Sequence, residues 1–287
     1  MLPPIEDHFV QTNGVELHVV MAGDPEGPKV LLLHGFPEFW YGWRHQIGPL
    51  VKAGYRVVVP DQRGYNLSDK PGSMADYSVG QLSRDAVGLI DHLGVERVKL
   101  VGHDWGGYVA WWVALQFPER VEQLAVLNIP HPIAFSRALR RWPQLRKSWY
   151  ILFFQLPWLP EALLAKGGYA ALLNLMKKSC RRGAIAPADL EHYQRAYAQP
   201  GALKAMLSWY RAAFRLRAER LRTRVVEPPT LVVWGQRDEA LGWEMAQPSV
   251  ELCRDGRLEL IADAGHFVAL DSAREVNASL LDFFAER

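Results

Sequence analysis

Short apolar runs alternate with amphipathic stretches at both ends of the chain. Runs typical of strands occupy 15–23, 29–36, 55–61, 98–104, 122–130, 229–238 and 257–266. Stretches with helical spacing occupy 39–53, 78–93 and 105–118, and a last one runs from Ser272 to Glu286. Because the later apolar runs are nearly continuous, we expect strands of a parallel sheet that is covered on both faces. The alternation predicts an α/β fold with right-handed crossovers.

The middle of the chain breaks this rhythm. Residues 132–215 contain no convincing strand, and their Leu, Ala, Arg and aromatic side chains recur at helical spacing. We therefore expect a core domain made of 1–131 and 216–287 that is interrupted by an all-helical cap (lid) domain, 132–215. Residues 132–218 also hold 15 Lys and Arg against 3 Asp and Glu, a balance of +12 in a chain of net charge +2. A solvated basic face on the cap is the simplest interpretation of this asymmetry.

Composition excludes several classes of protein. The 287 residues are 49% hydrophobic and 22% charged, which is typical of folded domains and not of disordered or fibrous chains. Two cysteines, Cys180 and Cys253, are too few for a disulfide framework, and no apolar run reaches membrane-spanning length. We expect a cytoplasmic protein, monomeric or homodimeric, without an integral membrane segment. Because no recognition motif accompanies the basic charge, nucleic acid is not an expected partner.

The clearest chemical motif is VGHDWGG at 101–107. Asp104 follows a strand, and Gly102 and Gly106, two residues away on either side, permit the sharp strand-to-helix turn of a nucleophile elbow. The dipole of the following helix favours the ionised carboxylate. We expect His103 to buttress this turn. By itself the motif is equally consistent with an aspartate that only caps the helix.

Three further features at strand ends favour catalysis. The sequence HGFPE places the N–H of Phe36 beside the elbow, where it and the N–H of Trp105 form a two-donor oxyanion hole. WGQRD places Asp238 after a later strand, and AGH places His266 after the next one. Nucleophile, acid and histidine follow the order that this type of site uses. We therefore predict Asp104 as the nucleophile, His266 as the general base and Asp238 as the acid that orients the histidine.

Together, HGFPE, DQRGYNLSDKP, GHDWGG, LNIPHP, WGQRD and AGHF resemble the motifs of the α/β-hydrolase superfamily, and more narrowly those of its epoxide hydrolase and haloalkane dehalogenase branch. The resemblance covers essentially the whole chain. It implies a mostly parallel central sheet with helices on both faces and an inserted helical lid over the active site. It also implies that Tyr150 and Tyr210 are the two lid tyrosines that donate protons to an epoxide oxygen. We place Phe36, Trp105 and Phe267 in the substrate pocket.

An aspartate nucleophile restricts the reaction. Attack on an ester or amide carbonyl would give a reactive anhydride, whereas attack on a saturated carbon with a leaving group gives an alkyl–enzyme ester that water can cleave. Phenols suit an epoxide oxygen because they are neutral donors at pH 7, with an ordinary pKa of ~10. The expected reaction is therefore the opening of a small-molecule epoxide by water to a vicinal diol. The sequence has no metal-ligand spacing and no nucleotide-binding loop, so neither a metal nor a cofactor is expected.

Two alternatives share the fold. A haloalkane or haloacid dehalogenase would use the same triad of Asp104, His266 and Asp238. Dehalogenases commonly have an Asn after the His-Gly pair, where this chain has Phe36, and some take their acid from the end of the sixth strand, where Asn128 cannot serve. A non-catalytic ligand-binding homologue would lack part of the site, and here every group that the reaction needs is present.

Overall fold

The computed structural model describes residues 2–140, 142–181, 183–217 and 219–286. In these residues eight strands form one sheet in the order β1-β2-β4-β3-β5-β6-β7-β8. The strands are β1 (Glu6–Thr12), β2 (Val15–Ala22), β3 (Lys29–Leu33), β4 (Arg56–Pro60), β5 (Val98–His103), β6 (Val121–Leu127), β7 (Thr230–Gly235) and β8 (Gly256–Ile261). The β1–β2 and β2–β4 pairs are antiparallel and the others are parallel. The predicted mostly parallel sheet is confirmed.

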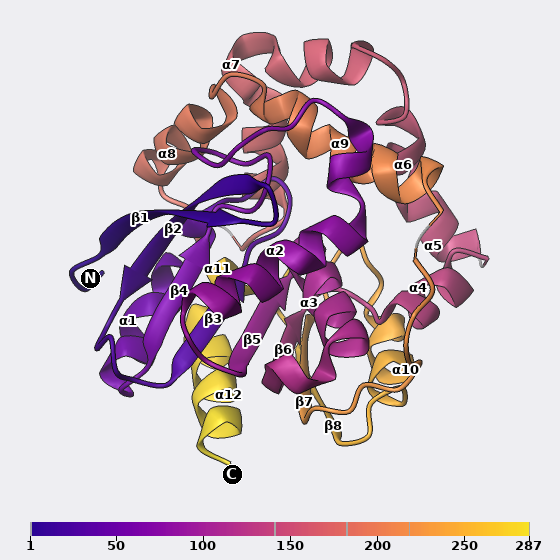
Figure 1. Cartoon of the computed structure of the whole chain (residues 1–287). Coiled ribbons are helices and arrows are strands. Elements are labelled where there is room, and N and C mark those ends of the chain that lie inside the picture. Colours follow the sequence, from indigo (N-terminus) through magenta and orange to yellow (C-terminus); the bar gives the residue numbers. More distant parts are fainter. Residues whose placement is uncertain (1, 141, 182, 218, 287) are drawn as a thin grey trace.

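Helices cover both faces of this sheet, and a separate group of helices lies over one end of it (Figure 1). The helices outside that group are η1 (Trp40–Trp43), α1 (Arg44–Lys52), η2 (Met74–Tyr77), α2 (Val79–His92), α3 (Asp104–Gln116), η3 (Pro118–Arg120), η4 (Trp243–Met245), α10 (Ala246–Val250), α11 (Val268–Asp271) and α12 (Ala273–Ala285). The group, called the insert below, comprises α4 (Pro132–Ala138), α5 (Trp142–Lys147), α6 (Trp149–Phe153), α7 (Leu159–Lys178), α8 (Pro187–Tyr197) and α9 (Ala202–Arg215). As predicted, the described residues of the insert form no strand.

Alternate side chains of the central strands are buried on opposite faces of the sheet. In β3, Leu31 and Leu33 join the apolar cluster that includes residues of α2 and α3. Val30 and Leu32 join the cluster that includes residues of α1 and α12. All four side chains are at most 1% exposed. Burial on both faces explains why these strands read as continuous apolar runs in the sequence.

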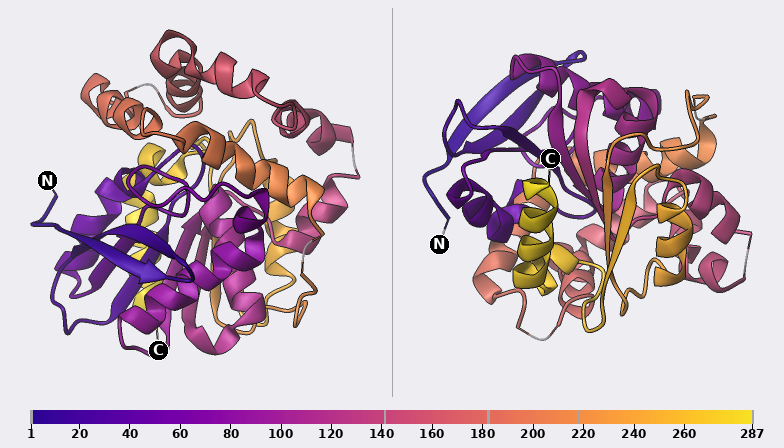
Figure 2. Two further views of the ribbon diagram at one scale, coloured as in Figure 1. Left: turned by 45° about the horizontal axis from the view of Figure 1, so that its top comes forward. Right: turned by 90° about the horizontal axis from the view of Figure 1, so that it is seen from below.

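The insert begins after β6 and is attached to the core by buried and partly buried polar contacts. Asp189 of α8 accepts hydrogen bonds from the hydroxyl of Tyr41 and from Nη2 of Arg44, both at 3.0 Å. The indole N–H of Trp209 in α9 donates to the carbonyl oxygen of Arg63 at 3.0 Å. These contacts fix α8 and α9 over the carboxyl ends of the parallel strands, where ligands bind in this type of sheet (Figure 2). No helix of the described chain is both long enough and apolar enough to cross a membrane.

Candidate active site

Asp104 lies at the sharp turn between β5 and α3. Its backbone is in the left-handed region, with a φ of +48°, which is uncommon for a residue with a side chain. The turn is close-packed, because a Cβ on Gly102 would lie 2.5 Å from the carbonyl oxygen of Gly106, and a Cβ on Gly106 would collide with the Leu33 carbonyl. Only glycine fits at these two positions. The result is the predicted elbow, which presents the carboxylate at the amino terminus of α3.

The loop after β3 approaches this carboxylate from the other side. The N–H of Phe36 donates to Oδ1 of Asp104 at 2.8 Å. A Cβ on Gly35 would lie 2.5 Å from Cβ of Asp104, so the loop can come this close only with glycine there. Trp105 is the second residue of α3, where a main-chain N–H has no acceptor within the helix. The two N–H groups expected to form an oxyanion hole therefore come from the residues that contact and follow Asp104.

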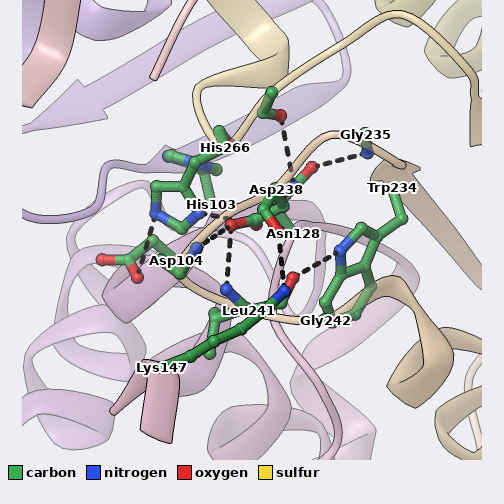
Figure 3. A network of polar contacts seen from close by, with 12 residues as sticks. His103, Asp104, Asn128, Lys147, Trp234, Gly235, Asp238, Leu241, Gly242 and His266 are labelled. Carbon is green, nitrogen blue, oxygen red and sulfur yellow. Dashed lines mark hydrogen bonds and ion pairs between the residues drawn. The ribbon is translucent and has the colours of Figure 1, made fainter. Parts of the chain in front are cut away.

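His266 follows β8 and lies between two carboxylates (Figure 3). Its Nε2 is 3.5 Å from Oδ2 of Asp104, and its Nδ1 is 2.7 Å from Oδ2 of Asp238. The other oxygen of Asp238 accepts hydrogen bonds from the N–H groups of Ala240 and Leu241, both at 2.8 Å. Asp238 is thus held firmly, and its contact with Nδ1 orients the ring so that Nε2 faces Asp104.

The pKa of His266 depends on both neighbouring carboxylates, and the pKa of Asp104 depends on His266. Burial lowers the pKa of His266, but the charges and hydrogen bonds of Asp238 and Asp104 outweigh burial and hold that pKa well above its ordinary value. Burial raises the pKa of Asp104, but the hydrogen bond and charge of His266 outweigh it, so the pKa lies below its ordinary value. Both shifts favour an ionised Asp104 beside a protonated His266.

Asn128 is part of this network, although the sequence indicated only that its position lacks an acid. It lies directly after β6 with a φ of +47°. Its Nδ2 donates to Oδ2 of Asp238 at 2.7 Å, and its Oδ1 accepts the N–H of Gly235 at 3.1 Å. The side chain thereby ties the end of β6 to Asp238. The signal available in the sequence was a polar residue directly after an apolar run, and the structure buries this side chain completely.

His103 makes two structural contacts next to the elbow, and one of them holds the main chain of His266. Its Nδ1 pairs with Oε2 of Glu38 at 2.8 Å, and its Nε2 donates to the main-chain carbonyl of His266 at 2.8 Å. The loop after β3, the end of β5 and the loop after β8 are therefore joined through one buried ring. Both nitrogens of His103 are occupied by these structural contacts, so it is not placed to act as a base.

Two tyrosines reach the site from the insert. Tyr150 of α6 and Tyr210 of α9 both line two cavities, of about 370 and about 260 Å³, that also share Asp104. The two phenol rings meet edge to face with centroids 6.0 Å apart, and Tyr210 packs in the same way against Trp105 at 5.0 Å. Burial, and after it the charge of Asp104, raise the pKa of both phenols, so both are protonated at neutral pH.

The two cavities differ in their walls. The larger one contains Trp105 and is mostly apolar, with Ile129, Phe135, Leu139, Ile151 and Phe214 among its lining residues. The smaller one contains the other two expected pocket residues, Phe36 and Phe267, together with His266. It also contains the charged Lys147 and Glu239. Within the described part of the chain, no group of three His, Cys, Asp or Glu side chains could hold a metal ion.

A mostly parallel sheet, an elbow after β5 and a helical insert after β6 define an α/β hydrolase. Residues 28–273 match the α/β-hydrolase fold family, and the chain belongs to that family. It is 43% identical to the AB hydrolase superfamily protein YfhM of Bacillus subtilis, covering 97% of this chain and 98% of that protein. It is 34% identical to epoxide hydrolase A of Mycobacterium tuberculosis, covering 96% of both.

Solved structures agree with the sequence comparison. The crystal structure of Bacillus megaterium epoxide hydrolase in complex with an inhibitor matches with a TM-score of 0.90 at 30% identity, covering 97% of this chain and 100% of that one. The predicted fold and the predicted likeness to epoxide hydrolases are therefore confirmed. The protein is an α/β hydrolase of the epoxide hydrolase type.

Proposed function

We propose that this protein hydrolyses epoxides to vicinal diols through a covalent ester on Asp104. The observation that carries the proposal is that Asp104, Tyr150 and Tyr210 together line both cavities. An ionised carboxylate thus faces two protonated phenols across a mostly apolar space. An epoxide needs both of these at once, because its ring opens by attack on carbon and by proton donation to oxygen. Relatives named as epoxide hydrolases support the same reaction.

In the first step, one oxygen of Asp104 bonds to an epoxide carbon while the bond from that carbon to the epoxide oxygen breaks. The released oxygen takes a proton from Tyr150 or Tyr210. The proton that His266 carries in the resting site restores the phenol. The products of this step are an alkyl ester on Asp104, a free hydroxyl on the substrate and a neutral His266, so atoms and charges balance.

Esterification itself prepares the second step. It removes the negative charge of Asp104, which is one of the two charges that hold the pKa of His266 high. The neutral imidazole then takes a proton from water, and the hydroxide oxygen bonds to the ester carbonyl carbon. The N–H groups of Phe36 and Trp105 stabilise the tetrahedral oxyanion, and each such donor contributes roughly 3 kcal/mol in related acyl chemistry. The bond from the carbonyl carbon to the alkyl oxygen then breaks, and the departing oxygen takes the hydroxyl proton of the tetrahedral intermediate. Release of the diol leaves the Asp104 carboxylate and the protonated His266.

The covalent intermediate can be tested by mass. His266→Gln should still be alkylated by a simple aryl epoxide but should cleave the ester very slowly, so the adduct accumulates. The intact protein should gain the whole mass of the epoxide, because ring opening releases no leaving group. Peptide mapping should place the adduct on Asp104. His8→Gln, a change at a partly exposed histidine of β1, should show normal turnover and no adduct.

Three outcomes would contradict this proposal. An adduct on a residue other than Asp104, or one that persists when Asp104→Ala is added, would show that Asp104 is not the nucleophile. Full turnover by His266→Gln would show that His266 is not the base. An adduct formed only from haloalkanes, with a mass lower than that of the substrate by the hydrogen halide, would identify a dehalogenase that uses the same triad.

A further inference from the structure

The insert exposes an unusual concentration of large apolar side chains. Among the described residues thirteen large hydrophobic side chains are exposed, and six of them fall within 145–163. We call these six the apolar patch; they are Leu145, Trp149, Leu152, Leu156, Trp158 and Leu163. Trp158 is 73% exposed and Trp149 is 64% exposed. Scattered apolar residues are normal on a protein surface, but such a concentration in one short segment marks an interaction surface.

The backbone conformation at Trp158 and the contacts on either side of it keep this side chain exposed to solvent. Trp158 has a φ of +50°, a left-handed conformation that is costly for a bulky residue. Arg211 of α9 fastens the segment before it by donating to the carbonyl oxygens of Phe154 and Leu156 at 3.0 and 2.8 Å. Arg211 also pairs with Glu161 at 2.6 Å on the other side of Trp158. The contacts of Arg211 therefore fix the chain on both sides of Trp158, while the tryptophan side chain itself stays exposed.

Positive charge accompanies the patch. Two of the three carboxylates in 132–218 are paired, Glu161 with Arg211 and Asp189 with Arg44. Exposed cations follow the apolar residues along the insert, at Arg146, Lys166, Lys177 and Lys178. In the described part of the chain none of these four forms an ion pair with a carboxylate. The surface is thus both apolar and positively charged, which suits a partner with apolar material beneath a negative surface.

The same surface adjoins both cavities of the active site. Trp149 of the patch and the exposed Leu175 of α7 line the smaller cavity, and the exposed Phe214 of α9 lines the larger one. The insert helices lie together over the sheet, on the side away from the carboxyl terminus (Figures 1 and 2). A partner that covers the patch would therefore lie next to the routes by which an apolar molecule reaches Asp104.

We propose that the insert docks on the surface of membranes that contain anionic lipids. Tryptophan side chains favour the boundary between headgroups and acyl chains, and exposed lysines and arginines are attracted by the negative lipid surface. A second copy of this chain is a poorer occupant, because a symmetric dimer through this face would bring together two copies of residues 132–218, each with a balance of +12. Peripheral docking of this kind needs no membrane-spanning helix.

Binding to vesicles at low salt tests the proposal directly. The protein should float with vesicles of phosphatidylcholine and phosphatidylglycerol in equal parts, and it should bind pure phosphatidylcholine far more weakly. Trp158→Asn should weaken binding about tenfold, because it removes apolar area that the membrane would bury. Asparagine tolerates the left-handed backbone at this position. The matched control is Trp243→Asn, which changes a tryptophan of η4 that is 41% exposed outside the insert. This control should bind like the unchanged protein.

Charge is tested separately. Lys177→Gln with Lys178→Gln should weaken vesicle binding roughly fivefold for each lysine, or roughly 25-fold for the pair. Lys52→Gln with Arg97→Gln removes the same charge from exposed positions outside the insert and should change binding little. Added salt should weaken binding by the unchanged protein and should affect the Lys177 and Lys178 variant less.

Several results would overturn the proposal. They are absence of binding to the anionic vesicles at low salt, equal losses in the test and control variants, or a dimer in sedimentation that Trp158→Asn converts to a monomer without any vesicle binding. The last result would assign the patch to a second copy of the chain. The measurement uses no substrate, so it is independent of the proposed epoxide hydrolysis. Asp104→Ala should bind vesicles like the unchanged protein.

Discussion

The core half and the insert half of the site are held by different kinds of interaction. In the core, directional hydrogen bonds hold Asp104, His266 and Asp238, with main-chain N–H groups contacting both carboxylates. In the insert, Tyr150 and Tyr210 are positioned by edge-to-face contacts with each other and with Phe154, at centroid distances of 5.0–6.0 Å. Hydrogen bonds weaken steeply when their geometry is disturbed, whereas edge-to-face ring contacts occur over a range of centroid distances. The difference separates a firmly held Asp104 and His266 from a more adaptable pair of tyrosines.

The largest expected effect tests whether the insert half supplies chemistry or only packing. Tyr150→Phe and Tyr210→Phe should each lower epoxide turnover by roughly 10²-fold, and the double change should nearly abolish it, since either phenol can partly replace the other. The rings keep their contacts, so the melting temperature should stay nearly constant. Tyr169→Phe, at a partly buried tyrosine of α7, is the matched control. Unchanged turnover in the double variant would remove both phenols from the mechanism.

A second test concerns the junction between the halves, where His131 precedes α4. Its Nδ1 accepts the N–H of Ile133 at 3.1 Å and so caps the helix. Burial, and after it the charge of Arg137, lower the pKa of His131 to about 4. Below pH ~6.5 the unfolded chain binds a proton that the folded protein excludes, so the free energy of unfolding should fall between pH ~6.5 and ~4, by about 3 kcal/mol at most.

His131→Asn isolates this contribution, because asparagine also caps a helix but does not titrate. Urea unfolding of both proteins across the pH window should show a steeper loss of stability for the unchanged protein, with no difference in slope above pH ~7. Parallel curves would show that His131 contributes nothing to acid sensitivity. In that case the titrating groups would lie within one of the halves and not at their junction.

A smaller effect tests the rigidity of the core half. Asn128→Ala removes one of the three hydrogen bonds that the carboxylate of Asp238 accepts from groups other than His266. Those from the N–H groups of Ala240 and Leu241 remain. We expect kcat to fall about tenfold, the equivalent of one buried hydrogen bond. KM should change little, since Asn128 lines neither cavity. A matched Asn277→Ala change in α12 should leave kcat unaltered. A rise in KM alone would assign Asn128 to the pocket.

The elements that the sequence predicts best are the strands that are buried on both faces of the sheet. The strand expected at 98–104 is β5 (Val98–His103), because side chains buried on both faces must all be apolar. The edge strand β1 (Glu6–Thr12) was missed, since Glu6 and Asp7 are exposed and the segment lacks a continuous apolar run. At the other edge the strand expected at 257–266 ends at Ile261, and the remaining residues form the loop that carries His266.

The residues of the candidate site likewise divide into those that the sequence indicated and those that it did not. Spacing and strand ends were sufficient to propose Asp104, Asp238 and His266, because each follows a strand at one edge of one sheet. The contacts of Asn128 with Asp238 and of His103 with Glu38 join segments 65 to 110 residues apart, which no local spacing reports. Tyr150 and Tyr210 came from resemblance alone, since a helical pattern does not show which aromatic residue faces a cavity.

The smallest expected effect tests whether the positive charge of the insert attracts anionic substrates from solution to the site. If the +12 balance of residues 132–218 attracts anionic substrates, kcat/KM for a carboxylate-bearing epoxide should fall several-fold between ~0.02 M and ~0.3 M salt, because the Debye length shrinks to below ~10 Å. A neutral epoxide of similar size should show no such dependence. Lys177→Gln with Lys178→Gln should flatten the slope for the anionic substrate without altering turnover of the neutral one. Equal salt dependence for both substrates would mean that these cations form only a solvated surface during catalysis, and that the adaptable half of the site selects substrates by packing alone.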